Sequence, residues 1–236
     1  MTAADQAAIG APPETPRSFR REITSGMQAG TPLAVAVFGF GVSFGILARS
    51  ADIGLLPSVV MSATTFAGSA QFAAAAVLDG GGGVAAAILA AVLLNARYLP
   101  MGISLAPAMN GGPLRRFLSP LLMCDESWAV AHLGGGRYSK GRLLGSGVLI
   151  YLAWIGGTAV GVLGAQALGR PEQFGFDVVA PAIFLALLVN QINDRRAAVA
   201  ALLGAAIAIT LTPFTSPGFP LIAAIGAALI GLGGKK

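Results

Sequence analysis

Residues 84–109 read VAAAILAAVLLNARYLPMGISLAPAM, and this stretch decides the fold because a single charged residue, Arg97, interrupts it. An α-helix rises about 1.5 Å per residue, so roughly 20 apolar residues cross the hydrocarbon core of a bilayer. The whole chain has 236 residues, of which 55% are hydrophobic and only 11% are charged. Soluble domains carry roughly 25% charged residues. The composition therefore excludes a soluble globular protein and predicts an all-α, polytopic transmembrane helical bundle.

Apolar segments recur on both sides of this stretch. Eight can be marked, at residues 28–48, 55–78, 84–109, 117–133, 143–168, 178–193, 197–212 and 218–234. We expect about seven to eight spans, some broken or kinked, because three segments are doubtful. The two at 178–193 and 197–212 are near or below the roughly 17-residue minimum, and 117–133 carries two acids in its middle. Polar residues 1–27 predict a cytosolic N-terminal tail, followed by a transmembrane transport domain over 28–234.

The basic residues predict the orientation of the segments, because Lys and Arg are enriched in cytoplasmic loops. With a cytoplasmic N-terminus and eight crossings, the inside segments would hold Arg17, Arg20, Arg21, Arg137, Lys140, Arg142, Arg195, Arg196, Lys235 and Lys236. The outside segments would hold Arg49, Arg115, Arg116 and Arg170. This bias favours eight crossings with both ends inside. Loss of one short crossing would move the C-terminal Lys pair outside.

Several kinds of chemistry are excluded by what the sequence lacks. The single cysteine, Cys124, allows no internal disulfide and no cysteine-based zinc site, and a lone His132 gives no metal site. The basic residues lie at the ends of apolar segments rather than in the continuous patch that nucleic-acid binding requires. No GxxxxGKS, GxxxxGKT, HExxH or CxxC motif is present. We therefore expect no direct ATP binding, no cofactor and no enzymatic activity.

Polar residues interrupt the second apolar segment at SATTFAGSAQF, residues 62–72. Any one hydroxyl there can bond back to its own helix, which is the plain structural reading. Five polar side chains in one stretch are harder to explain in that way. They are Ser62, Thr64, Thr65, Ser69 and Gln71. Gly68 beside Ser69 favours local unwinding, which would present backbone groups to a ligand near the middle of the membrane.

Arg97 lies near the centre of the third segment, where a guanidinium needs an anionic partner. That partner could be an internal carboxylate, Asp125 or Glu126, or the carboxylate of a bound substrate. The sequence leaves both readings open. Pro100 lacks an amide hydrogen and clashes with the preceding turn, so we expect a kink or break there. A break would also create a half-helix N-terminus, which suits an anionic group at mid-membrane.

Asp125 and Glu126 stand in the stretch MCDESWAVAH, residues 123–132. Adjacent residues on a helix point about 100° apart, so the two acids cannot face one partner equally. One could pair with Arg97 while the other lines a cavity and titrates, because a carboxyl group in a low-dielectric site has a raised pKa. Both acids are therefore candidate proton-coupling residues. The alternative is that this segment dips only to the interface and both acids are solvated.

Small residues recur at helix-packing spacing in two apolar segments. Gly41 pairs with Gly45, and Gly157 pairs with Gly161. Such pairs let helix backbones approach closely. Close packing matters in lipid, because lipid is itself apolar and gives no hydrophobic drive for helices to associate. We interpret these glycines as packing surfaces between helices.

The same stretches give the chain a resemblance to a known family. The matching residues are Gly30-Thr31-Pro32, Gly41-Val42-Ser43-Phe44-Gly45, Met61-Ser62, Phe66-Ala67-Gly68-Ser69-Ala70-Gln71-Phe72, Asn95-Ala96-Arg97-Tyr98, Gly102, Ser104, Leu105 and Asp125-Glu126-Ser127. FAGSAQF followed by NAR and DES at this spacing is specific, and the match covers roughly residues 26–170. The sequence resembles the AzlC family, whose members include the YgaZ-like large subunits of branched-chain amino acid exporters.

The resemblance implies a secondary transporter that exports branched-chain, apolar amino acids across the inner (cytoplasmic) membrane. It implies a multi-pass large subunit that works with a small AzlD-type subunit, and we expect the proton gradient to drive it. The candidate substrate-binding residues are Gly68, Ser69, Gln71, Asn95 and Arg97, and the candidate proton-coupling residues are Asp125 and Glu126. The alternative is a non-transporting or ABC-type permease subunit that depends on a separate ATPase.

A zwitterionic cargo would divide its charges among these residues. Arg97 or a half-helix N-terminus would take the carboxylate of the cargo. Unwound carbonyls near Gly68 and Ser69, or one of the two acids, would take its ammonium group. An apolar wall could come from Phe66, Phe72, Leu93 and Leu94.

Overall fold

The computed structural model describes residues 19–109, 112, 119–168, 185, 188, 189, 192, 195–215 and 219–226. This part of the chain is mostly α-helical, with one two-stranded hairpin. Three of its helices are long and apolar enough to cross a bilayer, namely Phe19–Ser50, Val84–Ala108 and Lys140–Ala165. The helical class is therefore confirmed, whereas a count of seven to eight spans is not confirmed within the described residues.

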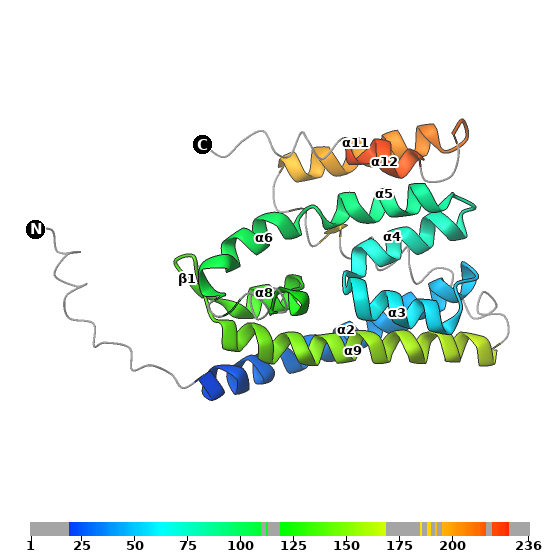
Figure 1. Cartoon of the computed structure of the whole chain (residues 1–236). Coiled ribbons are helices and arrows are strands. Elements are labelled where there is room, and N and C mark those ends of the chain that lie inside the picture. The colour runs from blue at the N-terminus through cyan, green and yellow to red at the C-terminus, as the bar shows by residue number, and fades with distance from the viewer. Residues whose placement is uncertain are drawn as a thin grey trace, which may run out of the picture.

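The framework of the fold is a pair of long parallel helices, α2 (Phe19–Ser50) and α9 (Lys140–Leu168), at the bottom of Figure 1. Glycines form their contact. A Cβ atom on Gly41 would lie 2.7 Å from the carbonyl oxygen of Trp154, and one on Gly161 would meet the carbonyl oxygen of Val42. Because lipid gives no hydrophobic drive between helices, such close backbone packing holds the pair together. The glycine packing surfaces predicted from the sequence are confirmed.

The first helix starts earlier than expected. α2 begins at Phe19, inside the tail predicted over residues 1–27. Gly26 explains the extension, because a Cβ atom there would lie 2.7 Å from Cα of Arg142, so this part of α2 already packs on α9. Helix packing therefore moves the start of the first helix towards the N-terminus. The polar composition of this region did not indicate that packing.

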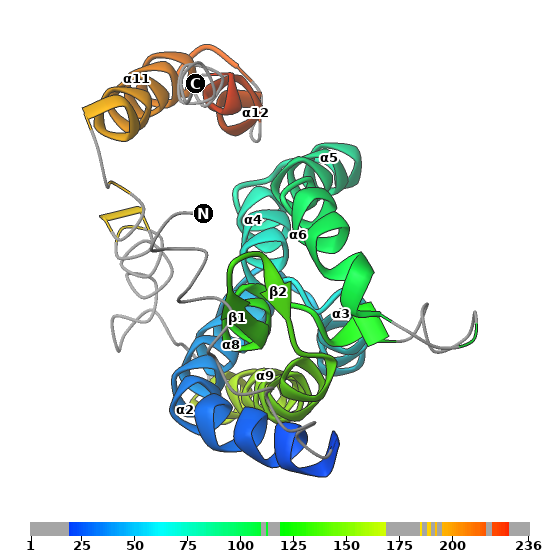
Figure 2. The same cartoon turned by 90° about the vertical axis from the view of Figure 1, so that its left-hand side faces the viewer.

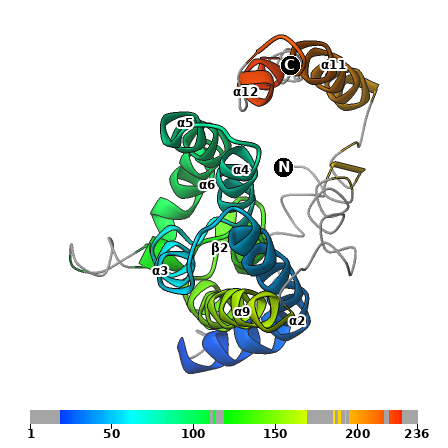
Figure 3. The ribbon, with the colours of Figure 1, turned by 90° about the vertical axis from the view of Figure 1, so that its right-hand side faces the viewer.

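The predicted second span, 55–78, is instead a hairpin of two short helices, α3 (Leu55–Thr65) and α4 (Gly68–Asp79). The chain reverses at Phe66, whose φ of 42° lies in the left-handed region. α3 packs beside α9 and α4 packs beside α5, so both ends of the hairpin lie at the end of the bundle where α2 finishes (Figures 1 and 3). Hydropathy could not reveal the reversal, because both arms are equally apolar.

The third segment is a long helix broken near its middle. α5 (Val84–Asn95) and α6 (Tyr98–Leu105) are separated by Ala96 and Arg97, and a short 3-10 helix, η1 (Ala106–Ala108), extends α6. The predicted break is present, but it precedes Pro100 rather than falling on it. Pro100 lies in the first turn of α6, where its missing N–H needs no partner within the helix.

The predicted fourth span, 117–133, is also not a single helix in its described part. η2 (Ser119–Leu122) precedes α8 (Asp125–Ala131), and strands β1 (His132–Gly134) and β2 (Arg137–Tyr138) follow as an antiparallel pair. Cys124 packs with Ile150, whereas Ala131 packs with Leu143 near the start of α9. α8 therefore runs from the middle of the bundle back to the end where α2 and α9 begin. Figure 2 looks onto this end, with β1 and β2 in front of α8.

The C-terminal region is described only in part. α11 (Arg195–Leu211) and α12 (Phe219–Ile225) pack against each other and fall in the predicted segments 197–212 and 218–234. Most of the predicted segment 178–193 lies outside the described residues. The same holds for these basic residues of the orientation argument: Arg17, Arg115, Arg116, Arg170, Lys235 and Lys236.

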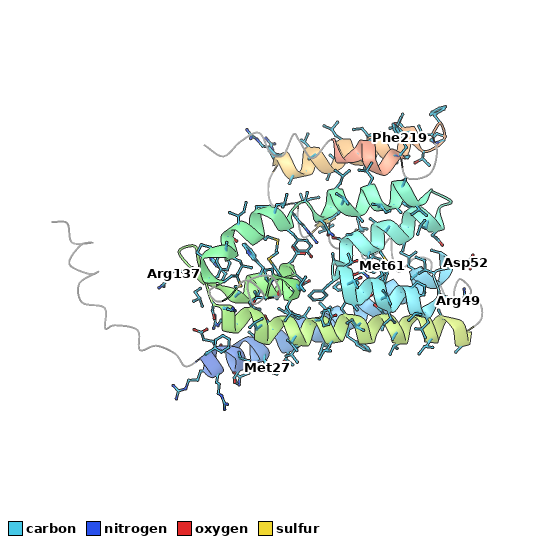
Figure 4. All side chains as sticks on the ribbon, in the orientation of Figure 1. Met27, Arg49, Asp52, Met61, Arg137 and Phe219 are labelled. Carbon is cyan, nitrogen blue, oxygen red and sulfur yellow. The ribbon has the colours of Figure 1, made fainter. Side chains whose placement is uncertain are left out.

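The two ends of the bundle differ in charge. At the end where α2 and α9 begin, the described basic residues are Arg20, Arg21, Arg137, Lys140 and Arg142. Ser139 Oγ donates to Glu22 Oε2 at 2.9 Å at this end. Arg49 and Asp52, 3.5 Å apart, lie at the other end, as Figure 4 shows. Large apolar side chains are exposed between the ends, as contact with lipid requires.

Candidate functional site

Three interruptions of the helices meet around one cavity of about 270 Å³. They are the turn between α3 and α4, the break between α5 and α6, and the start of α8. Trp154 lines this cavity from a position halfway along α9, so the site lies midway between the ends of the bundle. The lining residues are Val37, Phe40, Phe66, Gly68, Ser69, Phe72, Arg97, Tyr98, Cys124, Asp125, Glu126, Ile150 and Trp154.

Arg97 is the cationic group of the cavity. Its Nη2 donates to Asp125 Oδ2 at 2.8 Å and to Ser69 Oγ at 2.8 Å. The guanidinium carbon also lies 5.5 Å from the ring centroid of Tyr98, which is a cation–π contact. The side chains of Arg97 and Asp125 are 43% and 47% exposed, so neither is enclosed in the packed core. Of the two partners that the sequence left open for Arg97, the internal carboxylate is the one present in this structure.

Gln71 holds the α3–α4 turn against α9. Its side chain is fully buried, and its Oε1 accepts hydrogen bonds from the Ala67 amide at 3.2 Å and from Trp154 Nε1 at 3.0 Å. Its Nε2 donates to Ser62 Oγ at 3.0 Å, and Ser62 Oγ lies 2.9 Å from Thr158 Oγ1. Gln71 itself does not line the cavity. Its contacts position the turn that does.

Phe66 of the turn and Gly68 and Ser69, the first two residues of α4, reach the cavity. A Cβ atom on Gly68 would lie 3.3 Å from the Trp154 ring, so the glycine lets the turn approach the cavity wall closely. Thr64, one turn earlier, donates to the carbonyl oxygen of Val60. This is the bond back to its own helix that any one hydroxyl in this stretch could form. The helix is interrupted between Thr65 and Gly68, so the local unwinding predicted beside Gly68 is confirmed.

Asp125 and Glu126 reach the cavity because α8 begins at them. Ser127 Oγ accepts a hydrogen bond from the Cys124 amide at 2.9 Å and lies 2.9 Å from the Leu122 carbonyl oxygen, to which it donates. This contact fixes the start of the helix and so the direction of both acids. Among the described residues, Glu126 forms no salt bridge.

One helix N-terminus adds positive potential to the same site. α4 begins at Gly68, which lines the cavity. A helix N-terminus is equivalent to roughly half a positive charge. Together with Arg97, this end makes this part of the cavity suitable for a carboxylate, while Glu126 offers the opposite charge.

The rest of the cavity wall is largely aromatic, with Val37, Cys124 and Ile150 beside the rings. Phe66 and Phe72 were expected there, whereas Leu93 and Leu94 do not line the cavity. Sequence reasoning missed Phe40, Tyr98 and Trp154. For Trp154 the sequence held a usable signal, because it is a tryptophan in the middle of a glycine-rich apolar segment. A large ring there fills the space that the small residues leave.

Asn95 is the last residue of α5 and lies beside the cavity rather than in its lining. Its Oδ1 is buried without a hydrogen-bond partner among the described residues. Of the predicted substrate-binding residues, the structure thus brings Gly68, Ser69 and Arg97 to the cavity. It leaves Gln71 and Asn95 outside the lining.

Comparison with known proteins identifies the family. The family model described as AzlC protein matches residues 32–168, which include all three interruptions. The branched-chain amino acid transport protein AzlC of Bacillus subtilis (strain 168) is 27% identical over 198 residues, covering 80% of this chain and 77% of that protein. An uncharacterized membrane protein of Archaeoglobus fulgidus is 30% identical over 216 residues, covering 86% of this chain and 92% of that protein. No solved structure matches the chain. The chain therefore belongs to the AzlC family, and it is a membrane transporter rather than an enzyme.

Proposed function

We propose that this protein exports branched-chain, apolar amino acids across the inner membrane as a secondary, proton-coupled transporter. The observation that carries the proposal is a cavity midway through the bundle that combines a guanidinium, two carboxylates and aromatic walls. A zwitterionic, apolar cargo needs these three surfaces, for its carboxylate, its ammonium group and its side chain. The name of the Bacillus subtilis relative supports branched-chain amino acids as that cargo.

The size of the cavity supports a small cargo. At about 270 Å³ it is smaller than the roughly 300–1,000 Å³ pockets that hold drug-sized ligands. Burial of each substrate methylene contributes about 0.8 kcal/mol, which is enough to favour leucine over alanine. Leucine and isoleucine are isomers of equal size, and valine is smaller by a single methylene, so we expect the three to be accepted as a group.

The two acids support coupling to protons. Both line the cavity that would hold the cargo, so a proton on either acid changes the charge that the cargo meets. Sites that share charges in this way are thermodynamically linked, and binding at one alters affinity at the other. In the proposed cycle, a proton enters the cell on Asp125 or Glu126 as the amino acid leaves.

The charge of the two ends supports an orientation. The basic end of the bundle, where α2 and α9 begin, would face the cytoplasm by the positive-inside rule. In this proposal the protein is the multi-pass large subunit, and a small AzlD-type subunit packs against it. The α5–α6 helix supports such packing, because apolar residues such as Val92, Leu99 and Ile103 are exposed along it.

Flux in reconstituted vesicles tests the proposal. Vesicles that contain the protein with the small subunit are preloaded with labelled leucine, and a pH gradient is imposed without ATP. We expect efflux that follows the gradient and stops in Arg97→Ala, with Thr64→Val as the matched control in α3 that keeps wild-type flux. A strict requirement for ATP would support the permease-subunit reading instead, and absence of leucine flux under either condition would overturn the proposed substrate.

A further inference from the structure

One amino group of the cation in the cavity, Nη2, is already fully hydrogen-bonded within the protein. Arg97 Nη2 carries two hydrogens, and one is donated to Asp125 Oδ2 and the other to Ser69 Oγ, both at 2.8 Å. The N-terminus of α4 lies beside the same group, because Ser69 is the second residue of that helix. A carboxylate oxygen therefore occupies the position where positive charge is concentrated, and this oxygen belongs to the chain rather than to a ligand.

The second acid is in a different situation. Glu126 lines the same cavity, and among the described residues it has no salt-bridge partner. With Arg97 neutralised by Asp125, the formal charge left over among these three side chains is that of Glu126. The aromatic rings of Phe66, Phe72 and Trp154 line the same cavity, and aromatic faces attract organic cations.

Building on the proposed function, we propose that Asp125 is a tethered substitute for the carboxylate of the cargo. It fills the anion subsite on Arg97, so the cavity in this state binds apolar primary ammonium compounds that lack a carboxylate. A ligand carboxylate takes the place on Arg97 Nη2 only after Asp125 has left it. An amino acid must therefore displace Asp125, whereas an amine of the same shape need not.

Three ligands of similar shape and different charge separate the two subsites. Leucinamide offers only the ammonium group, 4-methylpentanoate offers only the carboxylate, and leucine offers both. A hydrogen-bonded contact to a charged group contributes about 1.5–3 kcal/mol, which corresponds to roughly tenfold or more in affinity. We expect wild-type protein to bind leucinamide at least about tenfold more tightly than 4-methylpentanoate.

Trp154 provides the readout, because it lines the cavity. The chain has two tryptophans, and the other, Trp128, donates to Ser104 Oγ at 3.0 Å and does not line the cavity. The full-length Trp128→Phe variant therefore reports ligand binding through Trp154 fluorescence alone. The comparison of leucinamide with 4-methylpentanoate in this variant decides the proposal, because the variant leaves every residue that lines the cavity unchanged.

Two variants then test the assignment of each acid. In Asp125→Asn, Arg97 loses its internal anion, so binding of 4-methylpentanoate should rise by about tenfold or more while leucinamide binding persists. In Glu126→Gln, leucinamide binding should fall by a similar factor. Asp79→Asn, an exposed acid at the end of α4, is the matched control and should change neither affinity.

The outcomes distinguish this inference from the proposed function. If 4-methylpentanoate binds the wild type as tightly as leucinamide, or gains nothing in Asp125→Asn, the inference is overturned even where labelled leucine is still exported. If the charge pattern holds but leucine is neither bound nor exported, the assignment of Asp125 and Glu126 stands and the proposed cargo is wrong. If none of the three ligands alters Trp154 fluorescence at millimolar concentration, both are overturned.

Discussion

Replacing Gln71 by Leu removes the side chain that fixes the α3–α4 turn, with little change in volume. Gln71 Oε1 accepts from two buried donors, the Ala67 amide and Trp154 Nε1, and its Nε2 donates to Ser62 Oγ. A buried donor left without a partner costs about 1–3 kcal/mol, so the two stranded donors should lower the free energy of unfolding by about 2–6 kcal/mol. Leu keeps the packing volume but supplies no acceptor.

Thermal unfolding of the purified protein measures this loss. For a chain of this length, 1 kcal/mol corresponds to roughly 2–4 °C in Tm, so the Tm of Gln71→Leu should fall by at least about 4 °C. Thr64→Val is the matched control in the preceding turn, because Thr64 only bonds back to Val60, and its effect should stay within about 0.5 kcal/mol. Equal Tm values for the two variants would refute the role given to Gln71 in holding the turn.

Three further predictions follow from the same structure. Arg97→Ala should abolish leucine efflux while membrane insertion is retained, and Arg97→Lys should also be impaired because an ammonium group cannot form the planar contacts of a guanidinium; wild-type flux in both would remove Arg97 from the mechanism. Gly161→Ala should destabilise the protein by about 1–3 kcal/mol, because its Cβ meets the backbone of α2. Gly164→Ala faces open space and should not lower Tm. Equal melting curves for the two variants would contradict the glycine packing. In a cysteine-free background, Asp52→Cys and Asp79→Cys should react with an impermeant thiol reagent from the same side of the membrane, whereas a crossing helix over 55–78 would place them on opposite sides.

Local chemistry made the position of the helix breaks predictable. Gly68 beside Ser69 indicated unwinding, and the chain does reverse there, at Phe66. Pro100 indicated a break in the third segment, and α6 begins just before it at Tyr98. The glycine pairs indicated close helix packing and lie between α2 and α9. Each of these signals depends on a few neighbouring residues, which a sequence displays directly.

Features that depend on contacts distant in the sequence were harder to predict. The hairpin over 55–78 has the length and hydropathy of a span, and only its packing on α9 and α5 shows that it returns. The role of Gln71 depends on Trp154, which lies far along the chain. The partner of Arg97 stayed open for a physical reason, since an internal carboxylate and a bound one satisfy a guanidinium equally well.

Protection of one engineered cysteine by the cargo tests the central claim most directly. Ser69 lines the cavity. A Ser69→Cys variant in a cysteine-free background therefore reports whether leucine occupies the place where the three interruptions meet. We predict that leucine slows the reaction of this cysteine with a small thiol reagent. Thr64→Cys on the neighbouring turn should react at the same rate with and without leucine. Equal rates with and without leucine at Ser69→Cys, in protein that still exports leucine, would contradict it.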